Sequence, residues 1–298
     1  MTGIGQMVAT ELRAERHGER SPASIVFLIS LWGAMAFAVI CLMVLLVDSF
    51  LDGATRLDIE LFTRFTSQVL PERAGARAAI LGSAFVIALT AILAIPLGIA
   101  AGVYLEEFAD ARRWYNKLIE VNISNLAAVP AIIYGMLTAG FALAIGMERR
   151  VVLAGGIALA LLILPVVIIA TREAIRSVPQ EIRHGSLALG ATPLQTVWRQ
   201  TLPGAIPGIA TGSILALSRA LGEAAPLLLL GGLVFVNYDP NGLMSGFTTL
   251  PIQIYNWASQ PQQAFQEVAS AAIILMLVLL LIMNALAIVI RNRYQNRW

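Results

Sequence analysis

The sequence predicts an all-α, polytopic membrane protein with six transmembrane helices. The chain of 298 residues is 58% hydrophobic and 13% charged, whereas about 25% of the residues in a soluble domain are charged. Its mean hydropathy is +0.78. Six apolar segments are long enough to cross a bilayer, which takes about 20 residues of helix.

The predicted spans are apolar segments separated by shorter polar stretches. They cover residues 24–48, 77–105, 118–146, 151–171, 204–236 and 266–290. The first segment is too long for the core of a signal peptide and has no clear small-residue cleavage site, so it is expected to stay in the protein as a span. Residues 1–22 and 292–298 are predicted to be polar tails that flank a transmembrane domain of residues 23–291.

The distribution of basic residues predicts that both termini are cytoplasmic. Lys and Arg concentrate in the cytoplasmic loops of membrane proteins. Basic residues follow the second and fourth spans and recur in the C-terminal tail, whereas the loop of residues 236–266 has neither Lys nor Arg and is predicted to be external. The residues that run against this rule are Arg56, Arg64, Arg73, Arg77, Arg149 and Arg150.

Composition and missing motifs exclude several functions. The formal net charge of +2 gives no electrostatic footprint for nucleic-acid binding. Cys41 is the only cysteine, so an intrachain disulfide is excluded. Lys117 is the only lysine and precedes Leu118, so the GxxxxGK[ST] phosphate loop is missing. His17 and His184 form no HExxH site. The chain itself is therefore expected to be no enzyme and to bind no metal or cofactor.

Residues 177–203 form the longest polar interruption in the second half of the chain. Ser177 and Gln180 have the spacing of a capping box, in which each side chain binds the other residue's backbone amide at the start of a helix. Gly190 is a natural stop, because glycine tolerates the left-handed conformation that follows the last helical turn. The pattern predicts a first helix that ends at this glycine.

A second helix is predicted to follow at once. Thr192 and Gln195 repeat the capping-box spacing, and Pro203 is expected to end the helix. Arg183 and Arg199 are expected to face water. From spacing alone, an interfacial connector and a docking site explain this helix pair equally well.

Small residues and prolines predict how the spans pack. Gly98 and Gly102 are four residues apart, as are Gly204, Gly208 and Gly212, and this spacing lets membrane helices approach closely. Prolines inside the apolar segments are expected to kink or interrupt them where neighbouring helices can satisfy the freed carbonyls. These prolines are Pro96, Pro130, Pro165, Pro207 and Pro226.

Two charges inside the fifth predicted span mark a candidate pathway. Arg219 and Glu223 are four residues apart and are expected to share one helix face. A charge at membrane depth costs at least about 2.5 kcal/mol, so such residues usually mark a solute pathway. A partly paired arginine presents a planar fork of donors that suits an oxyanion. Ser218 is expected to add polar lining, and a purely structural ion pair is the alternative.

The helix pair resembles the cytoplasmic loop of ABC importer permeases. That loop reads EAA, three residues, Gly, nine residues, Ile, one residue, Leu-Pro. Gly190, Leu202 and Pro203 match it at the required spacing, and Gln200 replaces its Ile. The residues that replace EAA are His184, Gly185 and Ser186.

Further stretches of residues 75–290 are similar to one of the two permease families of bacterial phosphate importers. They are residues 125–135, 189–209, 218–232 and 250–267. The resemblance implies the type I ABC importer permease fold, also called MetI-like. It implies a non-catalytic subunit of the bacterial inner membrane that forms half of a phosphate pathway, with a permease for a different oxyanion as the alternative. An intramembrane enzyme and a stand-alone ion-coupled carrier are the competing classes.

The resemblance also implies partners and roles. The partners are a sister permease (PstC) in a heterodimer, two copies of an ATPase (PstB) that uses ATP and Mg²⁺, and an external phosphate-binding protein (PstS). The loop of residues 236–266 would meet the binding protein, and Arg219 would lie along the phosphate route. The implied ATPase-coupling residues are His184, Gly185, Ser186, Gly190, Ala191, Thr192, Pro193, Leu202 and Pro203.

Overall fold

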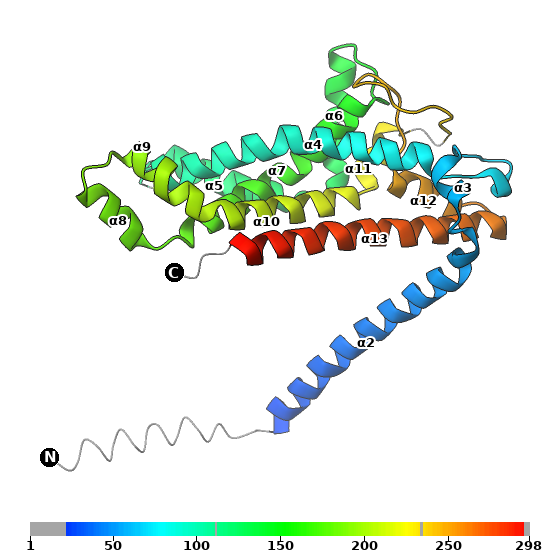
Figure 1. Ribbon diagram of the computed structural model, residues 1–298, viewed down its shortest axis with the longest axis horizontal. Helices are drawn as coiled ribbons and strands as arrows, with labels where there is room; N and C mark the ends of the chain where they lie inside the picture. Colours follow the sequence, from blue (N-terminus) through cyan, green and yellow to red (C-terminus); the bar gives the residue numbers. More distant parts are fainter. Residues whose placement is uncertain (1–21, 111, 233–234, 295–298) are drawn as a thin grey trace. The chain divides into compact units, whose positions relative to one another are not determined.

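The computed structural model describes residues 22–110, 112–232 and 235–294 (Figure 1). In these ranges the regular structure is helical, apart from one isolated β-bridge between Val151 and Gly246. The all-α prediction is therefore confirmed. The chain divides into two compact units, residues 1–49 and 50–298. Residues 1–21 and 295–298 of the two predicted polar tails lie outside the described residues, whereas residues 292–294 continue helix α13 (Gln263–Tyr294).

Helix α2 (Pro22–Gly53) supplies the first predicted span. Its apolar side chains are exposed along its length, including Phe27, Trp32, Phe37 and Leu45. A helix that is apolar on every side is suited to a hydrocarbon environment. Cys41 lies on this helix and is exposed.

Four long helices of the second unit run side by side (Figure 1). They are α4 (Arg77–Val103), α7 (Val152–Arg176), α10 (Leu202–Leu221) and α13 (Gln263–Tyr294). Helix α7 is the central one, because α4 and α10 both pack against it and it contributes more residues to the main buried cluster than any other helix, including Leu159, Ile163 and Val167. Helix α13 packs against α10.

Glycines allow α4 and α10 to approach α7 closely, as the spacing predicted. A Cβ atom at Gly98 would lie 2.6 Å from Cγ1 of Val167, and one at Gly102 would lie 2.7 Å from Cβ of Thr171. Where α10 packs against α7, a Cβ at Gly212 would lie 2.5 Å from Cβ of Ala170. These contacts leave no room for larger side chains, so the glycines serve helix packing.

The third predicted span is bent and not straight. Helices α5 (Trp114–Ala127) and α6 (Ala131–Ala144) meet at 105°. Pro130 is the residue before α6 and fixes the backbone where α5 has ended. The described residues contain five helices that are long and apolar enough to span a membrane, or six when this bent pair counts as one span.

The fifth predicted span also differs from its expected course. The chain is already helical from Pro193, through a wide π-type turn η4 (Val197–Thr201), and Leu202 follows without a break. Helix α10 then ends at Leu221, and the short helix α11 (Ala225–Leu230) follows. The prediction of one helical span over residues 204–236 is therefore wrong, because Gly222 and Pro226 interrupt it.

The predicted external loop is largely folded. Residues 250–258 form helix α12, whose side chains Leu250, Ile252 and Trp257 are buried. Backbone carbonyls of Leu243 and Ser245 accept hydrogen bonds from the first amides of α7, at 2.8 and 3.0 Å. The loop is thus an integral part of this end of the bundle.

Short helices complete this end of the bundle. They are η1 (Ala54–Arg56), α3 (Ile59–Thr63) and η2 (Pro71–Arg73). Two arginines that ran against the loop-charge rule are paired here: Arg64 binds Glu60, and Nε of Arg77 lies 3.0 Å from Oδ1 of Asp239. The Arg77 pair joins the start of α4 to the segment that follows α11, whereas the Arg64 pair is local to α3.

Candidate functional site

The predicted helix pair forms at the end of the bundle where α4 and α7 terminate (Figure 1). Helix α8 (Gln180–Ala188) ends just before Gly190, which has a φ of +86°. Helix α9 (Pro193–Thr196) begins with a complete capping box between Thr192 and Gln195. The left-handed glycine and the second capping box confirm the predicted helix, turn and helix.

Two details of the predicted pair are wrong. Ser177 does not cap α8, because its hydroxyl donates to the carbonyl of Ala174 at 2.7 Å and so belongs to the end of α7. Pro203 does not end the second helix, because it lies in the first turn of α10, where proline is tolerated. The second helix of the pair therefore runs directly into a membrane-spanning helix.

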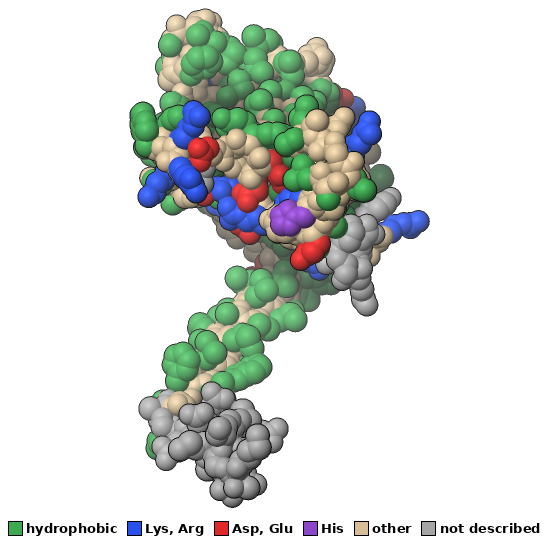
Figure 2. Space-filling view, turned by 90° about the vertical axis from the view of Figure 1, so that its left-hand side faces the viewer, with side chains coloured by type: hydrophobic (Ala, Val, Ile, Leu, Met, Phe, Trp, Pro, Cys, Tyr) green, Lys and Arg blue, Asp and Glu red, His purple; other side chains and the backbone are tan. Residues whose placement is uncertain are grey.

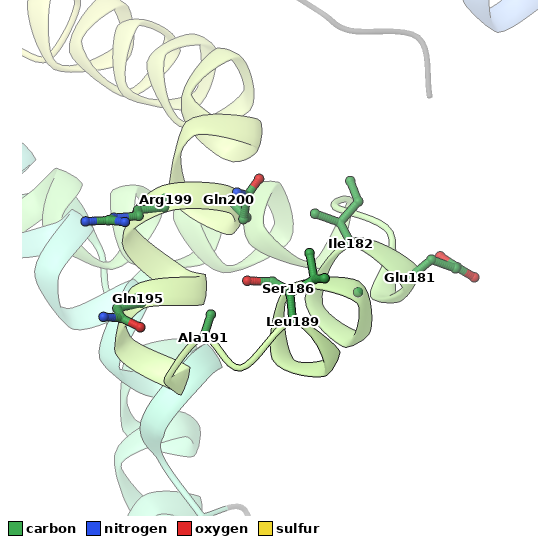
Figure 3. A pocket seen from close by; sticks show the side chains of 9 residues that line it. Glu181, Ile182, Ser186, Leu189, Ala191, Gln195, Arg199 and Gln200 are labelled. Carbon is green, nitrogen blue, oxygen red and sulfur yellow. The ribbon is translucent and has the colours of Figure 1, made fainter.

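A cleft of about 380 Å³ lies between α8 and the start of the next helix. Its lining includes Gly185, Ser186, Leu189, Ala191, Gln195 and Arg199. In Figure 3, Ser186 is directed toward the α9 side of the cleft, while Glu181 and Arg199 extend away in opposite directions. The hydroxyls of Ser186 and Thr196 are 2.9 Å apart and join the two helices across the cleft.

The outer surface of the helix pair is free of tertiary contacts among the described residues. The side chain of Leu189 is 91% exposed, and Leu194 and Trp198 are also exposed. A Cβ atom at Gly185 or Gly190 would meet nothing within 4 Å. His184, Thr192, Pro193 and Pro203 are exposed, whereas Ser186, Ala191 and Leu202 are half-buried. Nothing in the described part of the fold covers this apolar and polar surface.

Charged side chains gather at the same end of the molecule (Figure 2). Arg183 was expected to face water, but its side chain is only 12% exposed. Its Nη2 atom lies 2.9 Å from Oε1 of Glu107 and 2.8 Å from the carbonyl of Ile175. The expectation is therefore wrong, because an acidic side chain of another helix draws this arginine inward.

The neighbouring acid, Glu106, binds the end of α7. Both acids lie in η3 (Tyr104–Phe108), a wide π-type turn that follows α4. Oε2 of Glu106 lies 3.1 Å from Nε of Arg172, and Oε1 lies 2.7 Å from Nε of Arg176. Arg172 also binds Glu120 of α5 at 2.7 Å. This ionic network was missed in the sequence, although two adjacent acids after an apolar helix were a visible signal.

The two charges predicted to lie inside the fifth span are at the break between α10 and α11. Arg219 is in the last turn of α10, and Glu223 lies beyond the helix end. The expectation that the two share one helix face is therefore wrong, because α10 ends at Leu221, before Glu223. Nε of Arg219 still lies 3.7 Å from Oε1 of Glu223, and their side chains are 57% and 25% exposed. This distance is too long for a hydrogen bond, so the guanidinium keeps its donors for another group.

Ser218 occupies a different environment from Arg219. It is buried, and its hydroxyl donates to the carbonyl of Ile214 at 3.0 Å on its own helix. The structure therefore brings Arg219 and Glu223 together but leaves Ser218 apart from them. A role for Ser218 in a pathway stays a prediction.

An apolar recess lies beside this break. Its volume is about 340 Å³, and Gly222 and Ala224 line it together with Tyr255 of α12 and Met276 of α13. Within the described ranges, no group of three or more His, Cys, Asp or Glu side chains could hold a metal ion. The chemistry that this region offers is therefore that of one exposed guanidinium beside an apolar surface.

Comparison with known proteins places the chain in a family. A family model described as "Binding-protein-dependent transport system inner membrane component" matches residues 94–296. The phosphate transport system permease protein PstA of Yersinia pestis is 30% identical over 280 residues, which cover 94% of each chain. PstA 1 of Mycobacterium tuberculosis (strain CDC 1551 / Oshkosh) is 35% identical over 225 residues, which cover 74% of this chain and 73% of that protein.

A solved structure shares the fold. It is a bacterial alginate ABC transporter in complex with an alginate pentasaccharide-bound periplasmic protein. The TM-score is 0.62 at 17% identity, and the match covers 93% of this chain and 99% of that chain. The predicted type I ABC importer permease fold is thus confirmed. The chain belongs to the family of binding-protein-dependent transport system inner membrane components and, within it, to the PstA phosphate transport permeases.

Proposed function

We propose that this chain is the membrane-spanning permease subunit of an ATP-driven phosphate importer and forms half of its translocation pathway. The observation that carries this proposal is the exposed guanidinium of Arg219 at the break after α10. The similarity to PstA proteins over most of the chain supports phosphate as the cargo.

The geometry around Arg219 suits a transient oxyanion site. A guanidinium binds phosphate oxygens through two parallel N–H groups. Glu223, at 3.7 Å, partly offsets the cost of the charge in the membrane without occupying the donor fork. A site on a transport route must bind its cargo weakly enough to release it. The carboxylate of Glu223 would repel the phosphate anion and so weaken its binding to Arg219.

The surface of α8 and α9 is the proposed contact for the ATPase. It is exposed, it includes the cleft of about 380 Å³, and it continues without a break into α10, which carries Arg219. A force applied at α9 therefore acts directly on the helix that ends at the proposed phosphate route. In this proposal the ATPase binds the ATP and Mg²⁺, and this chain binds no cofactor.

The proposed complex contains a sister permease (PstC), two copies of the ATPase (PstB) and an external binding protein (PstS) in the bacterial inner membrane. The helix-pair end and both termini would be cytoplasmic. The folded segment of residues 236–266 would be on the external side, where it would meet the binding protein.

Substitution of Arg219 in the purified, reconstituted complex tests the proposal. Arg219→Ala should lower uptake of labelled phosphate by roughly ten- to hundred-fold, because a hydrogen bond to a charged group is worth about 1.5–3 kcal/mol. Arg219→Lys should give an intermediate rate, because it keeps the charge and loses the fork. Glu223→Gln is the matched control for the pair.

The outcomes separate the alternatives. If Arg219→Ala and Glu223→Gln both prevent assembly of the complex, the pair is structural. If the complex transports another oxyanion and added phosphate does not inhibit that transport, the assignment of phosphate as the cargo is wrong. Unchanged phosphate uptake by Arg219→Ala would remove Arg219 from the route.

A further inference from the structure

The only basic side chain on α8 other than its histidine turns inward and connects three helices. Arg183 is 12% exposed, as is its partner Glu107. The guanidinium donates to Oε1 of Glu107 at 2.9 Å and to the carbonyl of Ile175 near the end of α7 at 2.8 Å. Because breaking a buried ion pair leaves an uncompensated charge, the two partners tend to move together.

Glu107, the acidic partner of Arg183, lies beside a residue that binds the central helix α7. Glu107 and Glu106 are adjacent in η3, so the backbone that carries one carries the other. Glu106 is held by Arg172 at 3.1 Å and by Arg176 at 2.7 Å. A displacement of Arg183 is therefore passed through two neighbouring carboxylates to the end of α4 and to α7.

Few other contacts hold α8 among the described residues. None of its residues is fully buried. Ile182 packs against a small apolar cluster that includes Ile175 and Val178 and that Ile99 and Val103 of α4 also contact. Ser186 meets Thr196 of α9. The ion pair is directional and mostly shielded from solvent, so it adds a connection of fixed geometry between α8 and the end of α4.

The arginine also keeps a spare donor. Its Nε is buried and has no hydrogen-bond partner among the described residues. A buried donor without a partner is costly and calls for an explanation. A second arrangement of α8 would account for the unpaired Nε. In that arrangement the guanidinium would bind a different acceptor, and Nε would donate a hydrogen bond that it does not make here.

We propose that Arg183 and Glu107 are positioning residues that transmit displacement of α8 to α4, with Glu106 passing it on to α7. The inference rests on the proposed role of α8 as an ATPase contact. ATP-driven movement of α8 would pull on η3 through the ion pair, so that α4 and α7 shift together with α10. Allosteric coupling requires such a differential contact between two states.

The test uses the complete complex in proteoliposomes, with Glu107→Gln, Arg183→Gln and the double variant. We expect phosphate taken up per ATP hydrolysed to fall at least about five-fold in each, the lower range of coupling between sites. The double variant should be no worse than the single variants, because both remove one contact. Arg183→Lys should recover part of the ratio.

Asp110→Asn is the matched control. Asp110 follows the same turn and contacts Arg113 at 3.8 Å, but both side chains are more than half exposed. An exposed pair contributes little, so this variant should keep the ratio of uptake to hydrolysis within about two-fold.

A second readout does not depend on the transported solute. Tyr104, at the start of η3, is 51% exposed. In a Cys41→Ser background, the labelling rate of Tyr104→Cys by a maleimide should differ between nucleotide-free and ATP-bound complex. Glu107→Gln should abolish this difference, whereas Asp110→Asn should preserve it.

Each outcome decides the inference. It is overturned if the variants keep both the uptake ratio and the nucleotide-dependent labelling, or if they lose the complex itself, since the pair then only holds the fold. If the unsubstituted complex takes up no phosphate, the proposed cargo is wrong. The labelling readout then still decides the role of the ion pair.

Discussion

At the scale of single residues, Gly190 shows how one backbone conformation sets the geometry of a surface. Its φ of +86° turns the chain between α8 and α9, and nothing lies within 4 Å of the place where a Cβ would be. A substitution there is therefore opposed by backbone strain and not by collision. Gly185, five residues earlier, lies in the interior of α8 and is equally free of neighbours.

Gly190→Val should loosen the α8–α9 turn by about 1–2 kcal/mol, the cost of a left-handed conformation for a residue with a side chain. Hydrogen–deuterium exchange of the amides in residues 185–196 should accelerate by about five- to thirty-fold. Gly185→Ala should slow it, because alanine is about 0.5–1 kcal/mol better than glycine in a helix. Equal exchange in both variants would contradict the assigned role of the turn.

Local backbone signals were read correctly at Gly190 and Thr192 but not at Ser177 and Pro203, and the distant side-chain partners were missed. The capping box at Thr192 and the stop at Gly190 depend on residues within four positions of each other. The partner of Arg183 is 76 residues away, and the partner of Arg172 in η3 is 66 residues away. Nothing in a single sequence gives the register that brings such distant charges together, and Arg183 was therefore wrongly expected to face water.

At the scale of helices, the predicted number of six spans agrees with the structure when the bent pair α5 and α6 counts as one span, but the predicted shape of two spans was wrong. Pro130 and Pro226 were recognised as possible interruptions, but apolar composition on both sides concealed that the helices actually end there. Arg219 and Glu223 consequently lie across a helix end. The guanidinium of Arg219 is therefore exposed at the break between α10 and α11, which hydropathy alone does not reveal.

The close contact of α4 with α7 at Gly98 can be tested by enlarging the glycine and shrinking its partner, Val167. Gly98→Ala should lower stability by about 1–3 kcal/mol through overpacking, because its Cβ would lie 2.6 Å from Cγ1 of Val167. Adding Val167→Ala should restore part of the loss. The midpoint of thermal unfolding in detergent measures both effects.

Gly140→Ala in α6 is the control for that series, since a Cβ there meets nothing within 4 Å. It should leave the unfolding midpoint unchanged or raise it slightly. A similar drop for Gly140→Ala and Gly98→Ala would show that glycine content, and not the close contact of α4 with α7, determines stability.

At the scale of the whole molecule, the second unit has two chemically different ends. One carries α8, α9 and the ionic network, and the other carries α3, α12 and the segment of residues 238–249 (Figure 1). The family and the fold were predicted from motifs that cover most of the chain. The orientation of the ends rests on loop charges and on the resemblance of the helix pair to a cytoplasmic loop, and it stays a prediction.

Accessibility labelling tests this orientation. In a Cys41→Ser background, Leu189→Cys should react with a membrane-impermeant maleimide only from the cytoplasmic side, and Met244→Cys only from outside. Both side chains are well exposed, at 91% and 64%. Reaction of the two positions from the same side, or Leu189→Cys from outside, would overturn the predicted topology and the ATPase contact with it.

The hydrogen bonds from the first amides of α7 to Leu243 and Ser245 restrict how this segment, which is predicted to be external, can vary. Surface loops commonly tolerate extra residues. Here an insertion between Leu243 and Gly246 would shift the carbonyl acceptors out of register with the central helix. An epitope tag for detecting the protein at the cell surface would therefore be better tolerated near Gln260–Gln262, between α12 and α13. The backbone hydrogen bonds of these residues are made with α12 and α13 themselves and not with a third helix.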